Sequence, residues 1–352
     1  MDADVTPQLV ERARAASAEG TPLRIVGGDT RRFYGRDVAG DAFPTREHAG
    51  ILRHDPAELV LTARGGTSLT EVEAVLAGRG QRLPFDPPRF GAGTTLGGAV
   101  ASGLAGPARA WAGPVRDYVL GVRLLTGDGR VLRFGGEVMK NVAGYDVARV
   151  MAGSLGILGV LLEVSLKVLP RPAAERTLVL DVSEHEALER LGGLSSSTLP
   201  LSASAWSAGR LHLRFEGSEA TLDEIERRIG GEVDEHAVEF WTAVRDHTGA
   251  ALAGTGPLWR CTLPPLSPAL PMGTPLLVEW NGQQRWYRPA PGVDVQAVAA
   301  AVGGHATAFR RDAGTTDAFA PLPPAVLRLH RELKRVFDPA GVLNPGRMYA
   351  GL

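Results

Sequence analysis

Short runs of alternating hydrophobic and polar residues, separated by glycine-rich turns, dominate the first half of the chain. This period-two pattern is typical of half-buried strands, while spacings of three and four residues predict amphipathic helices. Ser68 and Glu71 form a capping box at the start of one such helix. The expected elements are a helix that ends near Gly20, strands over 23–26, 58–63 and 160–168, and a hairpin over 117–134.

After residue 172 the glycine clusters become rarer, and strands alternate with helices. We expect strands over 178–182 and 211–215, helices over 184–191 and 221–229, and a hairpin over 276–287 that turns at Asn281-Gly282. A last helix around 326–336 precedes a glycine- and proline-rich tail that needs a docking surface to stay ordered. The predicted domains are 1–172, an α+β cap over 173–320, and a segment 321–352 that returns to the first domain.

Length and charge narrow the classes of function. A chain of 352 residues is long enough for two hydrophobic cores. A net charge of −1 without a basic patch predicts no nucleic-acid partner. The chain shows no signal sequence and no apolar run near the roughly 18 residues of a membrane span. We therefore expect a cytoplasmic protein that touches a membrane, at most, through its partners.

Cysteine content limits the redox chemistry of this chain. Cys261 is the only cysteine, so an internal disulfide is excluded. An iron–sulfur cluster normally takes about four thiolates, so any such cluster belongs to a partner. The eight histidines include no pair spaced like metal ligands on one helix face or strand, and we predict no metal site.

Glycine is concentrated where the chain is expected to meet a ligand. The turns at 27–30 and 93–98 and the segment 135–159 carry bare backbone, which suits close approach to a large ligand. Two glycine turns also suit a pyrophosphate held by main-chain amides. A Rossmann site is not expected, because Gly91-Ala92-Gly93 follows no clear strand and the third glycine and the acidic ribose partner are misplaced. The long segment 86–116 reads as an ordered, functional loop.

Several stretches together carry a family resemblance. They are LRIVGGDTRRFYGR at 23–36, the GAGTTLGGAVASG run within 83–121, the run at 133–172, GGHATAF at 303–309 and the NPGRMY tail within 337–352. The chain resembles the FAD-binding flavoproteins of the vanillyl-alcohol-oxidase (PCMH) type, and among them the glycolate oxidase E-subunit family. The resemblance implies an α+β fold with a two-subdomain PCMH-type FAD-binding domain, a smaller α+β (ferredoxin-like) cap and a returning C-terminal segment.

The resemblance also implies where FAD binds. The pyrophosphate is expected at the first glycine turn, and the later residues are expected along the dinucleotide, the ribityl chain and the flavin. The implied cofactor-binding residues are Gly27, Gly28, Asp29, Thr30, Gly97, Gly98, Ser102, Gly113, Arg116, Asp117, Lys140, Asn141, Gly144, Tyr145, Gly156, Val160 and Asn344. For some of them other roles stay open: Arg116 and Asp117 also fit a salt-bridged turn, and Tyr145 also fits core packing.

Two departures from the family pattern shape the expected chemistry. Relatives that attach FAD covalently place a histidine in the first glycine turn, where this chain has Asp29, so we expect non-covalent FAD. Related hydroxy-acid dehydrogenases carry a histidine-rich metal site, which is missing here. His305, at an expected strand start, is the candidate catalytic residue, with a hydrogen-bonded structural histidine as the alternative.

Two functions from different classes follow from these observations. The first is an FAD-binding oxidoreductase subunit that oxidises glycolate, or a similar short 2-hydroxy acid, to the 2-oxo acid. The second is an FAD-carrying structural or electron-relay subunit without turnover of its own, and a stand-alone alcohol oxidase is a third possibility. The expected partners are a homologous catalytic flavoprotein subunit and an iron–sulfur subunit.

Overall fold

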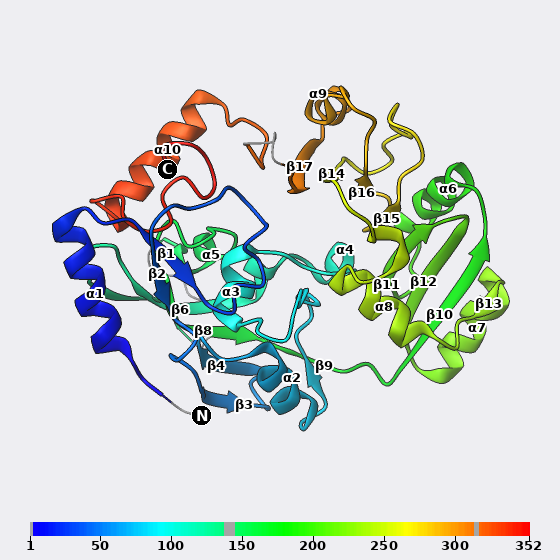
Figure 1. The fold of residues 1–352 in the computed structure, drawn as a ribbon. Helices are drawn as coiled ribbons and strands as arrows, with labels where there is room; N and C mark the ends of the chain where they lie inside the picture. The colour runs from blue at the N-terminus through cyan, green and yellow to red at the C-terminus, as the bar shows by residue number, and fades with distance from the viewer. Residues whose placement is uncertain (1–2, 137–144, 313–316) are drawn as a thin grey trace.

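The computed structural model describes residues 3–136, 145–312 and 317–352, which form two lobes side by side (Figure 1). The N-terminal lobe contains residues 3–136 and 145–170. The second lobe, here called the cap, is organised on a sheet that runs from residue 174 to residue 310. The C-terminal helix and tail, drawn in orange to red, leave the cap and lie against the N-terminal lobe.

The first elements of the N-terminal lobe follow the hydrophobic pattern closely. Helix α1 (Thr6–Glu19) buries Leu9, Ala13 and Ala16, and it ends where Gly20 takes a left-handed φ of 69°. Glycine adopts this conformation without a Cβ clash, so it stops the helix cleanly. Strand β1 (Leu23–Val26) then pairs in parallel with β2 (Asp41–Pro44). The predicted helix end and the predicted first strand are confirmed.

A five-stranded antiparallel sheet in the order β3-β4-β8-β6-β7 forms the centre of this lobe. Its strands are β3 (Ile51–Asp55), β4 (Val60–Arg64), β6 (Val119–Leu125), β7 (Val131–Gly135) and β8 (Val160–Lys167). Helices α2 (Leu69–Ala77), α3 (Leu96–Ser102) and α5 (Val147–Met151) share one apolar core with it. Short elements complete the lobe: β5 (Gln81–Arg82), α4 (Arg109–Ala112), a 3-10 turn (Val115–Tyr118) and β9 (Leu169–Pro170).

The cap is a single eight-stranded sheet, antiparallel at every pairing, in the order β13-β10-β12-β11-β15-β16-β14-β17. Its strands are β10 (Ala174–Asp181), β11 (Leu201–Ser207), β12 (Arg210–Gly217), β13 (Glu232–Val233), β14 (Leu258–Thr262), β15 (Leu277–Glu279), β16 (Gln284–Tyr287) and β17 (His305–Arg310). Its helices are α6 (Glu184–Ser195), α7 (Glu219–Ile229), α8 (Ala237–Asp246) and α9 (Val295–Ala301), with a 3-10 turn at Ala250–Leu252.

The first half of the cap has the connectivity of a ferredoxin-like unit. Its elements follow one another as β10-α6-β11-β12-α7-β13, which is a βαββαβ unit. Side chains from α6 and α7 share one apolar cluster with its strands. Strands β15, β16, β14 and β17 extend the same sheet, so the cap is wider than a single four-stranded unit.

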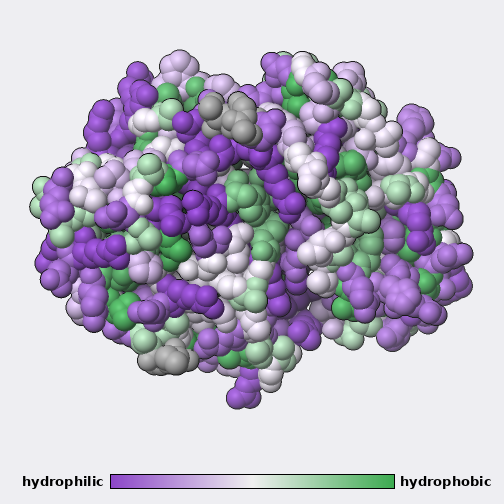
Figure 2. Space-filling model, in the orientation of Figure 1, coloured by the Kyte–Doolittle hydropathy of each residue, from purple (hydrophilic) through white to green (hydrophobic). Residues whose placement is uncertain are grey.

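The cap packs on the N-terminal lobe through aromatic and charged contacts. Trp280 donates its indole N–H to the Gly106 carbonyl at 3.0 Å, and the Asp246 carboxylate accepts the Arg89 amide at 2.9 Å. Between these contacts lies an apolar cluster that joins Tyr34 and Leu104 of the N-terminal lobe to inward side chains of the cap sheet. Figure 2 shows the resulting furrow between the lobes, where green and pale residues lie among purple ones.

The structure also corrects some expectations. The segment 86–116 is not an irregular loop, because it contains α3 and α4. Helix α3 starts at Thr95, whose hydroxyl accepts the Gly98 amide. Gly97 and Gly98 obscure the helical periodicity in the sequence, but the N-terminal hydrogen bond from Gly98 to Thr95 still forms and starts the helix. Strands β2 and β3 and helices α5 and α8 were not expected. None of the described helices is long and apolar enough to cross a membrane.

Candidate active site

Two glycine turns of the N-terminal lobe lie in direct contact and form one wall of a pocket. A Cβ added to Gly28 would lie 1.6 Å from the Gly93 carbonyl oxygen, and one added to Gly27 would lie 2.6 Å from Oγ1 of Thr95. The hydroxyls of Thr30 and Thr94 are 2.9 Å apart and join the turns. Glycine is required here because any side chain would push the two turns apart.

The first turn offers main-chain donors to a ligand. Within the described residues, the amides of Gly28, Asp29 and Thr30 donate to no protein acceptor. Asp29 holds a left-handed φ of 54°, so the turn folds back at this residue. Successive free amides in a tight turn form a concave anion site.

Arginines surround the same pocket. Arg24, Arg31, Arg32 and Arg347 all line it. Burial lowers the pKa of Arg31 to about 10, against the opposing charge of Asp246, and the guanidinium remains protonated at neutral pH. Free amides together with guanidinium groups suit the two negative charges of a pyrophosphate. The donor set therefore fits the dinucleotide cofactor that the sequence implies.

Eight of the residues implied by the resemblance line this pocket. They are Gly27, Gly28, Asp29, Thr30, Gly98, Ser102, Gly156 and Asn344. Asn344 comes from the C-terminal tail: its side-chain oxygen accepts the Ile25 amide at 2.8 Å, and its NH₂ group donates to the Leu155 carbonyl at 2.7 Å. The tail thus bridges both sides of the pocket.

Six other implied residues that the structure describes, Gly113 among them, do not line the pocket. Gly97 packs its backbone on Gly65, and a Cβ there would lie 2.9 Å from the Gly65 carbonyl oxygen. Val160 is buried in the core beside α1. Tyr145 is 95% exposed, which removes the core-packing alternative for it. Arg116 and Asp117 face each other at 3.8 Å on an exposed turn.

The remaining implied residues divide between a turn and the undescribed segment. Gly113 lies just before the exposed turn of Arg116 and Asp117, and its own φ of 96° favours glycine. The other three, Lys140, Asn141 and Gly144, lie outside the described residues. We assign no ligand contact to Val160, because its side chain is enclosed by apolar neighbours.

His305 opens strand β17 on the cap face that looks toward the N-terminal lobe. It pairs with Thr262 of β14, and its side chain is exposed. Partial desolvation lowers the pKa of His305, with further lowering by the charges of Arg260 and Arg109. The ring is therefore neutral at neutral pH and able to accept a proton.

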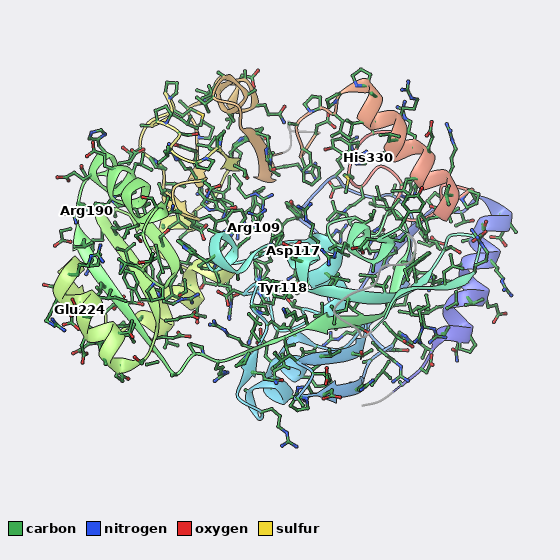
Figure 3. All side chains as sticks on the ribbon, turned by 180° about the vertical axis from the view of Figure 1, so that it is seen from behind. Arg109, Asp117, Tyr118, Arg190, Glu224 and His330 are labelled. Carbon is green, nitrogen blue, oxygen red and sulfur yellow. The ribbon has the colours of Figure 1, made fainter. Side chains whose placement is uncertain are left out.

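Two arginines accompany His305 at the junction of the lobes, where Figure 3 labels Arg109. The Arg109 guanidinium lies 4.4 Å from the centroid of the Trp280 ring. Arg260 donates to the Tyr34 hydroxyl at 3.1 Å and stacks over the Tyr34 and Phe309 rings. Among the described residues, neither guanidinium forms an ion pair. Two cations without a carboxylate partner, beside a neutral histidine, suit a small carboxylate ligand.

Glu279 lies behind these arginines in the closed part of the interface. Its side chain is 2% exposed and accepts from the indole of Trp286 at 2.6 Å and from Gln284 at 2.9 Å. Burial raises the pKa of Glu279 to about 7, although these two hydrogen bonds and the charge of Arg260 oppose the shift. The carboxyl is thus partly protonated at neutral pH and neutralises Arg260 only incompletely.

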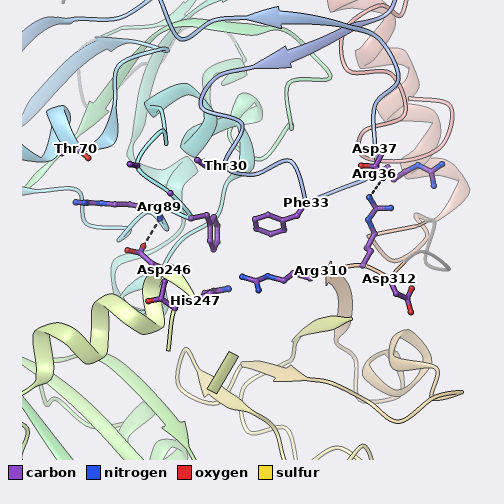
Figure 4. A pocket seen from close by; sticks show the side chains of 15 residues that line it. Thr30, Phe33, Arg36, Asp37, Thr70, Arg89, Asp246, His247, Arg310 and Asp312 are labelled. Atoms are coloured by element: carbon purple, nitrogen blue, oxygen red, sulfur yellow. Dashed lines mark hydrogen bonds and ion pairs between the residues drawn. The ribbon is translucent and has the colours of Figure 1, made fainter. Parts of the chain in front are cut away.

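A larger cleft, of about 1140 Å³, opens between the lobes (Figure 4). Phe33 and Phe90, whose rings meet edge to face, are part of its lining. Several of its charges are already neutralised by ion pairs, such as Arg311 with Asp37 at 3.0 Å and Arg89 with Glu73. Thr30, Gly91 and Ala92 line this cleft as well, but Gly27, Gly28, Asp29 and Gly98 line only the glycine pocket. We therefore place the cofactor in the glycine-lined pocket and not in this larger cleft.

Arg109 and Arg260 were not expected at the site from the sequence. The sequence held a signal for Arg260. In the strand Leu258–Thr262, alternation places residue 260 on the same buried face as Leu258, and an arginine stands there instead of an apolar residue. Arg109 stood inside the glycine-rich segment 86–116 without a periodic context. Within the described residues, no group of three or more His, Cys, Asp or Glu side chains is placed to hold a metal ion.

Comparison with known proteins agrees with the geometry. Residues 3–135 match the FAD binding domain family. The chain is 44% identical to the glycolate oxidase subunit GlcE of Escherichia coli over 352 residues, covering 100% of this chain and 99% of the relative. It is 33% identical to the glycolate oxidase subunit GlcD of Bacillus subtilis over 156 residues, 42% of this chain and 33% of that one.

A solved structure of alkyldihydroxyacetonephosphate synthase has the same fold, with a TM-score of 0.66 at 15% identity over 96% of this chain and 74% of the other. The expected PCMH-type fold is thereby confirmed. FAD as the cofactor is confirmed by the match to the FAD binding domain and by the end-to-end relative. The end-to-end match at 44% identity decides the family. The chain belongs to the glycolate oxidase subunit GlcE family.

Proposed function

We propose that this chain is the FAD-binding subunit of a glycolate oxidase complex that oxidises glycolate, or a similar short 2-hydroxy acid, to the 2-oxo acid. The observation that carries the proposal is the pair Arg109 and Arg260, which have no carboxylate partner among the described residues and whose charges act on His305. We assign residues 1–172 and 321–352 to FAD binding and residues 173–320 to the cap.

The cofactor would be held mainly by main-chain groups. The amides of Gly28, Asp29 and Thr30 would bind the pyrophosphate, and Arg31 and Arg347 would balance its charge. Bound FAD supplies the acceptor for the hydride that leaves the carbinol carbon of the substrate. Asp29 stands where covalently flavinylated relatives have histidine, so the cofactor would be bound non-covalently.

The substrate would be fixed by its carboxylate. Arg260 and Arg109 would donate to the two carboxylate oxygens, since charge-assisted hydrogen bonds from guanidinium groups are strong and directional. In this orientation the adjacent hydroxyl would lie on the side of His305. An unprotonated ring nitrogen of His305 would accept the hydroxyl proton as the carbonyl forms. The aromatic cluster of Tyr34 and Phe309 would exclude water from the arginine side.

The proposal includes partner proteins. The chain has one cysteine, Cys261, which is fully buried, so an iron–sulfur cluster that accepts electrons from the flavin would have to lie on another protein. We propose a homologous flavoprotein subunit and an iron–sulfur subunit in the cytoplasm. The alternative is a subunit that carries FAD without turning over substrate, while the homologous flavoprotein does the chemistry. The intact arginine–histidine site favours turnover in this chain.

The test is Arg260→Leu in the assembled enzyme. Loss of a charge-assisted hydrogen bond should raise KM for glycolate about 10- to 100-fold. Arg228→Leu, an exposed arginine on α7, is the matched control and should leave KM unchanged. Unchanged KM and kcat in a flavin-loaded Arg260→Leu enzyme would contradict the assignment of Arg260 to the substrate site.

A further inference from the structure

The C-terminal tail is part of the pocket wall, and one buried lysine holds it there. Leu343 of the tail forms a single parallel β-bridge with Leu23 of β1: Leu23 donates its amide to the Val342 carbonyl at 2.7 Å, and Asn344 donates its amide to the Leu23 carbonyl at 2.9 Å. Both Ile25 and Asn344 line the glycine pocket. The position of the tail therefore sets the shape of the pocket.

Lys334, on helix α10 (Pro324–Phe337), anchors this tail from behind. Its ammonium donates to the Ile157 carbonyl at 2.8 Å, the Leu343 carbonyl at 2.6 Å and the Asp338 carboxylate at 2.7 Å. The residue is 6% exposed and Asp338 is 1% exposed. Three donors on one ammonium thus meet three buried acceptors, which leaves the group fully satisfied.

The two carbonyls that Lys334 joins are each one residue from the pocket. Ile157 follows Gly156, and Leu343 precedes Asn344. Gly156 and Asn344 themselves meet closely, since a Cβ on Gly156 would lie 2.8 Å from the Asn344 side-chain nitrogen. The ammonium therefore fixes the spacing of two wall segments that are far apart in the sequence.

Asp338 completes the anchor. Its carboxylate accepts the amides of Val342 at 3.1 Å and Leu343 at 2.7 Å in addition to the Lys334 ammonium. These bonds turn the chain from the end of α10 toward its bridge with β1. A buried ion pair contributes little net stability compared with an apolar pair of the same size. Stability alone does not explain why this site is ionic.

We propose that Lys334 is a positioning residue for FAD: through Ile157 and Leu343 it holds Gly156 and Asn344 at the spacing that the bound cofactor needs. The inference rests on the proposed FAD site. By linkage, bound FAD also favours the anchored tail, so FAD and tail ordering stabilise each other. No contact between Lys334 and FAD is involved.

The test measures FAD affinity of the apoprotein by flavin fluorescence for Lys334→Met, with Asp338→Asn as a second, milder variant in case the first does not fold. We expect FAD affinity to fall at least about 10-fold in either variant that folds, on the scale of losing a buried charged hydrogen bond. Arg335→Met, an exposed neighbour on α10, is the matched control and should bind FAD like the wild type.

General destabilisation is separated by Leu222→Ala, in the cap core, which should lower the melting temperature and leave FAD affinity unchanged. Hydrogen exchange gives a second readout: FAD should protect the amides of Val342 and Leu343 in the wild type and much less in Lys334→Met. Wild-type FAD affinity in both Lys334→Met and Asp338→Asn would overturn the inference. If the wild type itself bound no FAD, the FAD site would fail instead.

Discussion

Replacing Gly98 with alanine should separate FAD affinity from protein stability. Gly98 lies in the first turn of α3 and lines the pocket. A Cβ there would meet only Oγ1 of Thr95, at 3.2 Å, and would otherwise project into open space. Alanine is the better helix former, so the free energy of unfolding of the apoprotein should stay level or rise by up to about 1 kcal/mol.

The same methyl group should weaken FAD binding, because it would occupy the space through which FAD approaches the main chain at Gly98. We expect at least about a 10-fold loss of affinity, or roughly 1.4 kcal/mol, for Gly98→Ala, and complete loss of FAD for Gly98→Arg. The two quantities thus move in different directions. Flavin fluorescence titration of the apoprotein gives the affinity, and thermal unfolding gives the stability.

The neighbouring glycine supplies the control. A Cβ on Gly97 would lie 2.9 Å from the Gly65 carbonyl oxygen, inside the protein. Gly97→Ala should therefore cost about 1 to 3 kcal/mol of stability through overpacking. Wild-type FAD affinity in Gly98→Ala together with stoichiometric FAD in Gly98→Arg would refute the placement of the cofactor along α3.

Three further predictions concern the histidine, the buried carboxyl and the cofactor linkage. His305→Asn should keep its FAD content and melting temperature and lose about 100-fold or more in activity, and a structural role would instead lower the melting temperature. Burial raises the pKa of Glu279 from 4.5 to about 7, so between these pH values the folded state holds a proton on Glu279 that the unfolded state has lost. The free energy of unfolding therefore falls as the pH rises from 4.5 to about 7. Glu279→Gln should show a smaller drop in melting temperature than the wild type between pH 5 and pH 8, and an identical drop would contradict the shift. Acid or heat denaturation should release free FAD, whereas flavin that stays on the polypeptide in a denaturing gel would show a covalent link.

Local sequence signals sufficed for the elements with clear periodicity. The helix end at Gly20 and the strand over 23–26 are correct to the residue. The hairpin expected over 276–287 also forms, but its last pair is Glu279 with Gln284, so Asn281-Gly282 lies inside a four-residue turn and not a two-residue one. The expected last helix, around 326–336, is observed as α10, and its tail docks on β1. At Gly20 and Gly282 a glycine in the left-handed region stands where the spacing of the apolar residues changes, which marks the end of one element and the start of the next.

Sequence reasoning failed where tertiary contacts outweigh local preference. The helix α3 contains Gly97 and Gly98, which lower helix propensity, yet the fold places Gly97 on Gly65 and leaves Gly98 open to the pocket. Arg109 and Arg260 come from separate lobes, and no local pattern brings them together. Lys334 is a basic residue in an amphipathic helix, and only the fold shows it buried.

Anaerobic addition of glycolate to the purified, FAD-loaded chain, with the visible flavin absorbance as the readout, asks directly whether this subunit oxidises the substrate. We expect bleaching of the flavin in the wild type and in Arg228→Leu. We expect far slower bleaching in His305→Asn and Arg260→Leu at equal flavin content. A fully loaded wild-type chain whose flavin stays oxidised in glycolate, while the assembled complex turns over, would contradict the claim that this subunit oxidises the substrate.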